Sequence, residues 1–145
     1  MIRATVYITV LLLVSSTLNS LRAEETVWIS LRVEISELTS DEGQIRISLF
    51  NSEEDWMSTP FNELEIDSEE GAALAVIEQI PRGDYAANFY QDPNGNGQLD
   101  TGFMRIPTEP YGFSRQASAA FGPPNWESAK IRIDGGNRLL TLRPQ

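Results

Sequence analysis

The sequence predicts an all-β fold, an antiparallel β-sandwich of about seven strands of immunoglobulin-like or transthyretin-like type, with long irregular loops. Three observations support this prediction. Apolar and polar residues alternate with period two in several segments, as expected for strands with one buried face. Clusters of Gly, Pro, Asn and Asp separate these segments. No amphipathic helical pattern occurs after the N-terminal apolar segment.

The N-terminal residues 1–23 are predicted to be a secretory signal peptide. Arg3 gives a positive start, residues 6–14 form an apolar run too short to span a bilayer, and a polar stretch leads to Ala23. Leu21 is bulky where a small residue is preferred, so an uncleaved membrane anchor is the alternative. We therefore expect a periplasmic or extracellular protein.

Residues 24–145 are expected to form a single domain that is stable without disulfides, because the chain has no cysteine. The whole chain carries 21 acidic and 11 basic residues, and loss of Arg3 and Arg22 leaves 9 basic against 21 acidic, a net charge of -12. This charge argues against nucleic acid and anionic membrane surfaces and favours divalent cations. Solubility alone would also explain it. We expect a monomer with an unknown protein or glycan partner and no membrane span after signal cleavage.

The first strand is predicted from alternating apolar positions that begin at Val27 and end at Ile35. Residues 40–43 form a turn, and Ile45, Ile47 and Leu49 define a second strand, so the two strands are predicted to pair as an antiparallel hairpin. Residues 51–67 are predicted to be a long loop with one helical turn whose aromatic side chains pack on the sheet.

The later strands follow the same logic. Apolar residues at Leu74, Val76 and Ile80 define one strand, and after a turn at residues 81–84 a further strand leads directly to Asp92. Residues 101–128 are rich in Gly, Pro and aromatics without a sustained period, and a loop of this length is usually functional or held by other contacts. A C-terminal hairpin is predicted from Ile131, Ile133, the turn at residues 134–137, Leu140 and Leu142.

Residues 92–100 predict a calcium-binding loop. Oxygen-bearing side chains occur at the first, third, fifth and ninth positions, glycine occurs at the sixth, and the seventh would contribute a backbone carbonyl. The predicted metal residues are Asp92, Asn94, Asn96, Gln98 and Asp100. Two Asn-Gly pairs would also suit a plain turn, which is the alternative.

The loop is not a complete helix-loop-helix hand. A strand precedes it, and Phe103 stands at the twelfth position, where such a hand places a bidentate Glu. The missing ligands would come from water or from Thr101, Glu109 or Asp84. With two carboxylates in the loop, we expect a weak structural Ca²⁺ site with a dissociation constant of about 10⁻⁴ to 10⁻³ M.

Aromatic residues of the irregular segment form a candidate binding surface. Tyr111, Phe113, Phe121 and Trp126 could stack on sugar rings or contact a protein partner. The alternative, which is slightly favoured, is that they cap the open end of the sandwich as a second core. The sequence leaves both alternatives open.

Catalysis has few candidate residues. The chain has no His and no Cys, and Ser114 has no candidate partner beyond Arg115. The acidic runs at residues 53–55 and 67–70 could supply an Asp/Glu pair for a carbohydrate-active hydrolase, although a solvated face is the favoured explanation of both runs. We expect no enzymatic activity and name no catalytic residue.

Five segments in order, residues 43–50, 81–86, 92–100, 110–114 and 121–124, resemble a family of small exported bacterial proteins classed as a domain of unknown function, DUF2141. The resemblance covers essentially the whole domain and implies an exported β-sandwich without an established activity. Members of this family often carry His directly before the first Asp of the loop, where this chain has Gln91. The turn at residues 81–85 is also similar to carboxypeptidase regulatory-like and collagen-adhesin B-type domains, which support or bind rather than catalyse.

These observations lead to one main hypothesis and two alternatives. The main hypothesis is an exported, non-catalytic module with a calcium-stabilised loop and a binding or envelope-associated role. The first alternative is a carbohydrate-active hydrolase, and the second is a ligand-free structural protein of the envelope.

Overall fold

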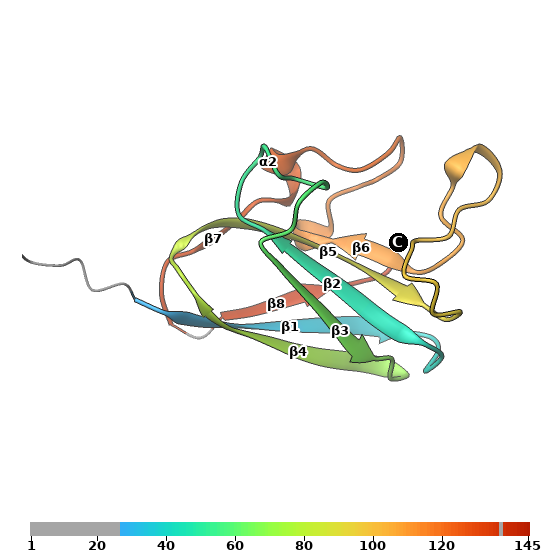
Figure 1. Cartoon of the computed structure of the whole chain (residues 1–145), viewed down its shortest axis with the longest axis horizontal. Helices are drawn as coiled ribbons and strands as arrows, with labels where there is room; N and C mark the ends of the chain where they lie inside the picture. Colours follow the sequence, from blue (N-terminus) through green and yellow to red (C-terminus); the bar gives the residue numbers. More distant parts are fainter. Residues whose placement is uncertain (1–26, 137) are drawn as a thin grey trace, which may run out of the picture.

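The computed structural model describes residues 27–136 and 138–145, so the predicted signal peptide at residues 1–23 lies outside the described residues. It confirms the all-β sandwich, with one sheet of three strands and one of five (Figure 1). The strands are β1 (Ile29–Leu38), β2 (Gln44–Phe50), β3 (Asn62–Asp67), β4 (Gly71–Ile80), β5 (Gly83–Asp92), β6 (Tyr111–Phe113), β7 (Ile131–Ile133) and β8 (Arg138–Leu142).

The two sheets have simple orders. The smaller sheet has the order β4-β1-β8, and the larger sheet has the order β3-β2-β5-β6. The short strand β7 also pairs with β5, at residues 83–85, whereas β6 pairs with residues 88–90 of the same strand. Strand β5 therefore lies at the centre of the larger sheet and ends at Asp92.

Two predicted hairpins are wrong. Strands β1 and β2 do not pair with each other, because β1 pairs with β4 and β8 while β2 pairs with β3 and β5. Strands β7 and β8 also do not pair with each other, because β7 pairs with β5 and β8 runs parallel to β1. Alternation determines which face of a strand is buried but not which strand lies beside it. Both connections cross from one sheet to the other instead of turning back within a sheet.

The predicted loop over residues 51–67 contains a strand at its end. Strand β3 pairs antiparallel with β2 along its whole length, from Asn62 opposite Leu49 to Asp67 opposite Gln44. Its apolar face is short and contributes only Leu64 and Ile66, which are half-buried at the sheet edge, while acidic residues occupy the other face. Trp56 lies in the preceding turn and packs on the domain, as predicted.

The domain has two apolar cores. The main core lies between the sheets and is formed by the inward-facing side chains of β1, β2, β4, β5, β7 and β8, including the fully buried Phe89 and Tyr85. A second core lies beside it and contains Phe50, Phe113 and Trp126. It packs the irregular segment onto the larger sheet.

The irregular segment between β5 and β7 has local structure that its sequence did not indicate. It contains two short 3₁₀ turns, η2 (Phe103–Arg105) and η3 (Ser114–Gln116), and the helical turn α2 (Trp126–Ala129). Residues 101–107 form a small hairpin, here called the tip hairpin, closed by a bridge between Thr101 and Pro107. The tip hairpin begins directly after the predicted calcium loop.

Candidate metal loop

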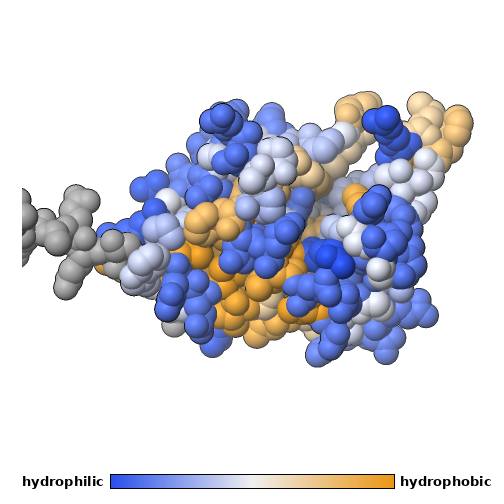
Figure 2. Space-filling view, in the orientation of Figure 1, coloured by the Kyte–Doolittle hydropathy of each residue, from blue (hydrophilic) through white to orange (hydrophobic). Residues whose placement is uncertain are grey.

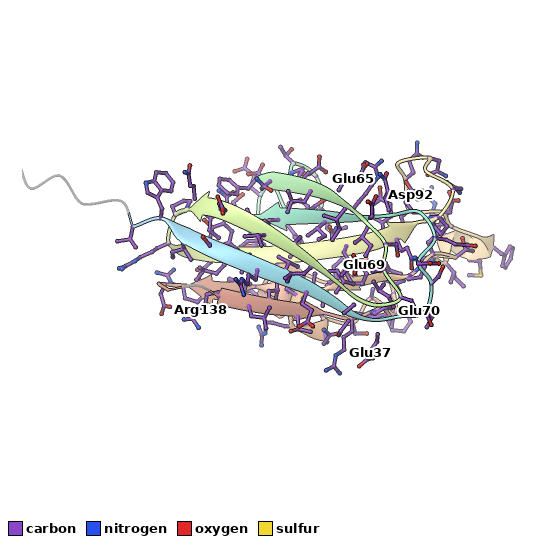
Figure 3. All side chains as sticks on the ribbon, turned by 90° about the horizontal axis from the view of Figure 1, so that it is seen from below. Glu37, Glu65, Glu69, Glu70, Asp92 and Arg138 are labelled. Carbon is purple, nitrogen blue, oxygen red and sulfur yellow. The ribbon has the colours of Figure 1, made fainter. Side chains whose placement is uncertain are left out.

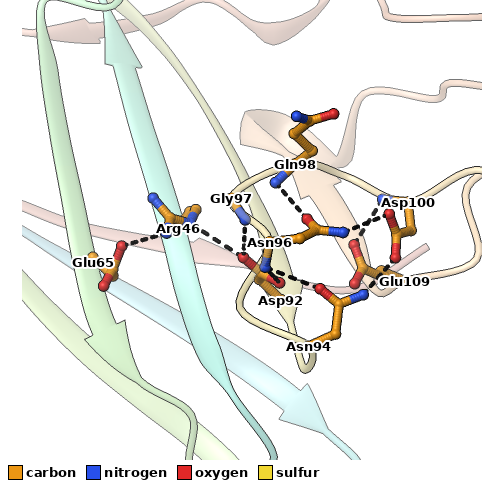
Figure 4. A network of polar contacts seen from close by, with 9 residues as sticks. All are labelled: Arg46, Glu65, Asp92, Asn94, Asn96, Gly97, Gln98, Asp100 and Glu109. Carbon is orange, nitrogen blue, oxygen red and sulfur yellow. Dashed lines mark hydrogen bonds and ion pairs between the residues drawn. The ribbon is translucent and has the colours of Figure 1, made fainter.

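Strand β5 places Asp92 at the base of the candidate loop, opposite Gln44 of β2. The Asp92 side chain is fully buried and accepts hydrogen bonds from two backbone N–H groups of the loop. The N–H of Asn96 donates to Oδ1 at 3.1 Å, and the N–H of Gly97 donates to Oδ2 at 2.8 Å (Figure 4). The loop is therefore wrapped around the first carboxylate of the motif.

The two asparagines point into the same space. Asn94 Oδ1 accepts the N–H of Asn96 at 3.0 Å, and Asn96 Oδ1 accepts the N–H of Gln98 at 2.8 Å. Their amide nitrogens donate to the two carboxylate oxygens of Asp100, at 2.6 and 2.9 Å. The side chains of Asn94, Asn96 and Asp100 are thus linked directly (Figure 4), whereas Asp92 joins them through the N–H of Asn96 and Gln98 through its own N–H.

Arg46 is a member of this network that the sequence did not indicate. Its Nε lies 3.4 Å from Asp92 Oδ2, and its guanidinium forms an ion pair with Glu65 at 2.7 Å. Arg46 is on β2, and only the pairing register of β2 with β3 and β5 brings it beside both acids. Its positive charge beside Asp92 opposes cation binding, which fits the weak site that the sequence predicts.

Of the three residues suggested as additional ligands, Glu109 is the one that is hydrogen-bonded to Asp100. Glu109 is nearly buried, and its Oε2 accepts the backbone N–H of Asp100 at 2.8 Å. Asp84 lies at the opposite end of β5, roughly 26 Å away at 3.3 Å per residue, and pairs with Arg132. Thr101 is exposed in the tip hairpin. Asp84 is therefore not a ligand of this loop.

The base of the loop is held by Gly43 and Gln91. The amide nitrogen of Gln91 lies 3.1 Å from the carbonyl oxygen of Ser40, 2.9 Å from that of Glu42 and 2.8 Å from Ser68 Oγ. These contacts tie the β1–β2 and β3–β4 connections to the end of β5. Gly43, at a φ of +72°, packs directly against the backbone of Asp92 and Pro93. Neither residue could be assigned this role from sequence, since both depend on contacts between distant connections.

The pKa of Asp92 is lowered by its hydrogen bonds. Burial by itself raises the pKa of this carboxyl, but N–H groups of Gly97, Asn96 and Gly95 and the Arg46 guanidinium stabilise the charged form more strongly. The net pKa therefore lies below the ordinary value of 3.8. Because the folded-state pKa is depressed, this carboxylate stabilises the fold above the ordinary pKa, and the contribution is lost as pH falls through the folded-state value.

We expect the melting temperature in chelator to fall as pH decreases from about 5 to about 3, because Asp92 takes up its proton more readily in the unfolded chain. Asp92→Asn should flatten this dependence. Asp134→Asn is the comparison: Arg138 also lowers the pKa of Asp134, but this ion pair is exposed and screened by water, so the slope should change little. Melts by circular dichroism across this range test the expectation, and equal slopes for wild type and Asp92→Asn would contradict it.

The donor set of the loop fits a hard cation such as Ca²⁺. The convergent groups are two carboxylates and two carboxamides, and an amide oxygen has lone pairs for both an N–H and an ion. Within residues 27–136 and 138–145, no three His, Cys, Asp or Glu side chains come together as a metal site. Any ion in this loop would therefore depend on the Asn94 and Asn96 amide oxygens and on water.

The four aromatic residues predicted as a binding surface do not form one surface. Phe113 and Trp126 are buried and Tyr111 is half-buried, and the first two belong to the second core. Trp56 completes this core: its ring centroid lies 6.0 Å from that of Trp126, and its indole N–H donates to the carbonyl of Pro124 at 2.7 Å. The alternative of a second core is therefore correct for Phe113 and Trp126, and only Phe121 is fully exposed.

The residues considered for catalysis are placed as follows. Ser114 is fully buried, donates to the carbonyl of Ala129 at 2.6 Å and accepts the N–H of Ala87 at 2.9 Å, which is a structural role. A depression of about 380 Å³ at the β3–β4 edge is lined by Glu65, Ile66, Asp67, Glu69, Ala73 and Leu74. No aromatic residue is in this lining, so the sugar-stacking side chain expected beside an Asp/Glu pair does not lie there. Glu65, Asp67 and Glu69 share this lining, whereas Glu70 is not part of it (Figure 3).

Fold and site together define a small β-sandwich domain with an acidic, asparagine-rich loop at the end of a central strand. A family model described as an uncharacterized protein conserved in bacteria, DUF2141, matches residues 33–141, so the chain belongs to that family. Searches of curated proteins and of solved structures found no match. Within the described residues, no helix combines the length and apolar character needed to cross a membrane.

Proposed function

We propose that this protein is an exported, non-catalytic module whose loop at residues 92–100 binds one Ca²⁺ weakly and for structural purposes. The observation that carries the proposal is that the amides of Asn94 and Asn96 meet the carboxylate of Asp100, while the N–H of Asn96 binds the carboxylate of Asp92. A plain turn would not require the side chains of Asn94, Asn96 and Asp100 to meet. The role of the module in binding or in the cell envelope is part of the same proposal.

The proposed mechanism acts on the segment that follows the loop. An ion would neutralise the carboxylates of Asp92 and Asp100. It would also displace the amide N–H groups of Asn94 and Asn96 from Asp100, and these two side chains would rotate to present their oxygens. The Asp100 backbone also contacts the far side of the tip hairpin: its N–H donates to Glu109, and its carbonyl accepts the N–H and hydroxyl of Thr108 at 2.9 and 3.2 Å. Ordering Asp100 therefore orders both strands at the root of the tip hairpin.

We expect millimolar Ca²⁺ to raise the melting temperature relative to chelator. At ten times the dissociation constant, the gain in unfolding free energy should be about 1.4 kcal/mol. Asp100→Asn should abolish the gain while leaving the calcium-free protein folded, because its carboxylate is not part of the core. Asp134→Asn is the matched control, since it removes one acidic group at a remote turn and should retain the full gain. Calorimetric or fluorescence melts measure both.

Two results would contradict this proposal. One is a wild-type midpoint that is the same in Ca²⁺ and in chelator. The other is an equal gain in Asp100→Asn and Asp134→Asn, which would show that Ca²⁺ acts on the general acidity of the surface and not on the loop.

A further inference from the structure

The tip hairpin ends in a cluster of exposed apolar side chains. Phe103 is 87% exposed, Met104 77% and Ile106 63%, and Arg105 is the only charged residue between them. Phe121, at the end of the separate loop formed by residues 119–124, is also fully exposed. Figure 1 shows both segments projecting from the same side of the sandwich, and Figure 2 shows apolar colour at both projections. Exposed apolar clusters of this kind mark interaction sites.

The turn of the tip hairpin uses residues that do not suit its geometry. Met104 and Arg105 both have positive φ, 58° and 60°, and the N–H of Ile106 donates to the carbonyl of Phe103 at 3.3 Å. A two-residue turn with two positive φ angles strongly favours Asn-Gly. Placing Met and Arg there strains the backbone, and backbone strain of this kind collects at functional positions. The geometry of the turn therefore does not account for the side chains at the tip.

Residues 101–126, which carry both projections, differ in charge from the rest of the protein. The chain carries 21 acidic residues, yet residues 101–126 contain one acid, Glu109, against Arg105 and Arg115. Glu109 is nearly buried and engaged by the Asp100 N–H, so it presents little negative charge. The two projections are thus free of the acidic repulsion that the body of the protein would exert on lipid phosphates.

We propose that these two tips insert into the surface of a phospholipid bilayer while the acidic sandwich stays in water. Two separate convex tips suit a flat and fluid surface better than a single groove on a protein. Part of the hairpin backbone is already paired internally, which lowers the cost of entering an apolar environment: the N–H of Gly102 donates to the carbonyl of Ile106, and the N–H of Arg105 donates to that of Gly102. Arg105 would reach the phosphate level while its neighbours enter the apolar layer. This inference rests on the proposed envelope-associated role but not on bound calcium.

The test is sedimentation of the exported, processed protein with phosphatidylcholine vesicles. Phe103→Ser/Met104→Asn removes two apolar side chains, and Asn at position 104 suits positive φ, so this variant should melt no lower than wild type. We expect its partition coefficient to fall roughly tenfold or more. The matched control is Leu74→Ser/Leu139→Ser, which removes two exposed apolar residues from the three-stranded sheet and should bind within about twofold of wild type.

A second measurement locates the tip directly. Phe103→Trp should show a blue-shifted emission component that is quenched by brominated lipid. Absence of vesicle binding by wild type, equal binding by the tip variant, or an unquenched Trp at position 103 would each overturn the proposal. If wild type fails to bind while Ca²⁺ still raises its melting temperature, bilayer insertion fails and the calcium proposal stands. Binding that persists in chelator supports insertion independently of the ion.

Discussion

Replacing Gly43 with alanine should destabilise the domain by roughly 3 kcal/mol, the sum of a left-handed backbone penalty and overpacking against fixed backbone. Gly43 has a φ of +72°, and a Cβ at this position would overlap the carbonyl oxygen of Asp92 and the Cα of Pro93. These atoms begin the candidate metal loop, so the substitution must displace either the β1–β2 connection or Asp92 itself. We expect the variant also to lose part of its calcium-dependent gain in stability.

Gly136→Ala is the matched control for this prediction. Gly136 has nearly the same φ, +69°, but among the described residues no atom beyond its chain neighbours lies within 4 Å of the position a Cβ would take. It should lose about 1 kcal/mol, from the backbone conformation alone. Chemical denaturation of both variants separates conformational strain from close approach. Equal losses would show that the contact between Gly43 and the loop is unimportant for stability.

Trp126→Ala should be the most damaging change in the irregular segment, with a loss of about 3 to 5 kcal/mol. Trp126 is buried against Phe113 and Trp56, in the second core that packs residues 101–128 on the larger sheet. The cavity left by the indole cannot be filled by the short helical turn α2, which Asn125 caps through the N–H of Ser128 at 2.9 Å. Equilibrium unfolding in urea measures the loss.

The paired variant is Phe121→Ala, five residues away in the same segment. Phe121 is fully exposed, and its removal should change stability by no more than about 0.5 kcal/mol. The two variants therefore separate the aromatic residues that hold the segment from the one available to a partner. A loss below about 1 kcal/mol in Trp126→Ala would contradict the assignment of this residue to a core.

The candidate loop shows how far local sequence determines a site. Asp92, Asn94, Asn96 and Asp100 could be named from spacing alone, because a nine-residue loop with glycine at its sixth position has few ways to fold. Arg46, Gln91 and Gly43 could not be named, since each reaches the loop from another strand or connection. Whether Glu109 or Asp84 lies near the loop likewise depended on the tertiary structure, since the tip hairpin returns Glu109 to Asp100 while Asp84 lies at the far end of β5.

The aromatic residues show the converse. The four aromatic residues of the irregular segment look alike in the sequence but differ in burial. Phe113 and Trp126 are buried in the second core, Tyr111 is half-buried, and Phe121 is exposed. Sequence periodicity distinguishes buried from exposed faces only within regular strands, and this segment has almost none. For the same reason, the sequence did not indicate that Phe103 and Met104 are exposed at the end of the tip hairpin.

The sequence by itself determined the all-β class, most strand positions, the absence of disulfides and the identity of the loop that converges at the end of β5. These features depend on local periodicity and spacing. The tertiary structure alone decided that β1 and β2 lie in different sheets, that β8 runs parallel to β1, and that Trp126 is buried while Phe103 and Phe121 are not. The physical reason is that strand pairing and burial of irregular segments depend on surfaces contributed by residues far away in the chain, which local pattern does not specify.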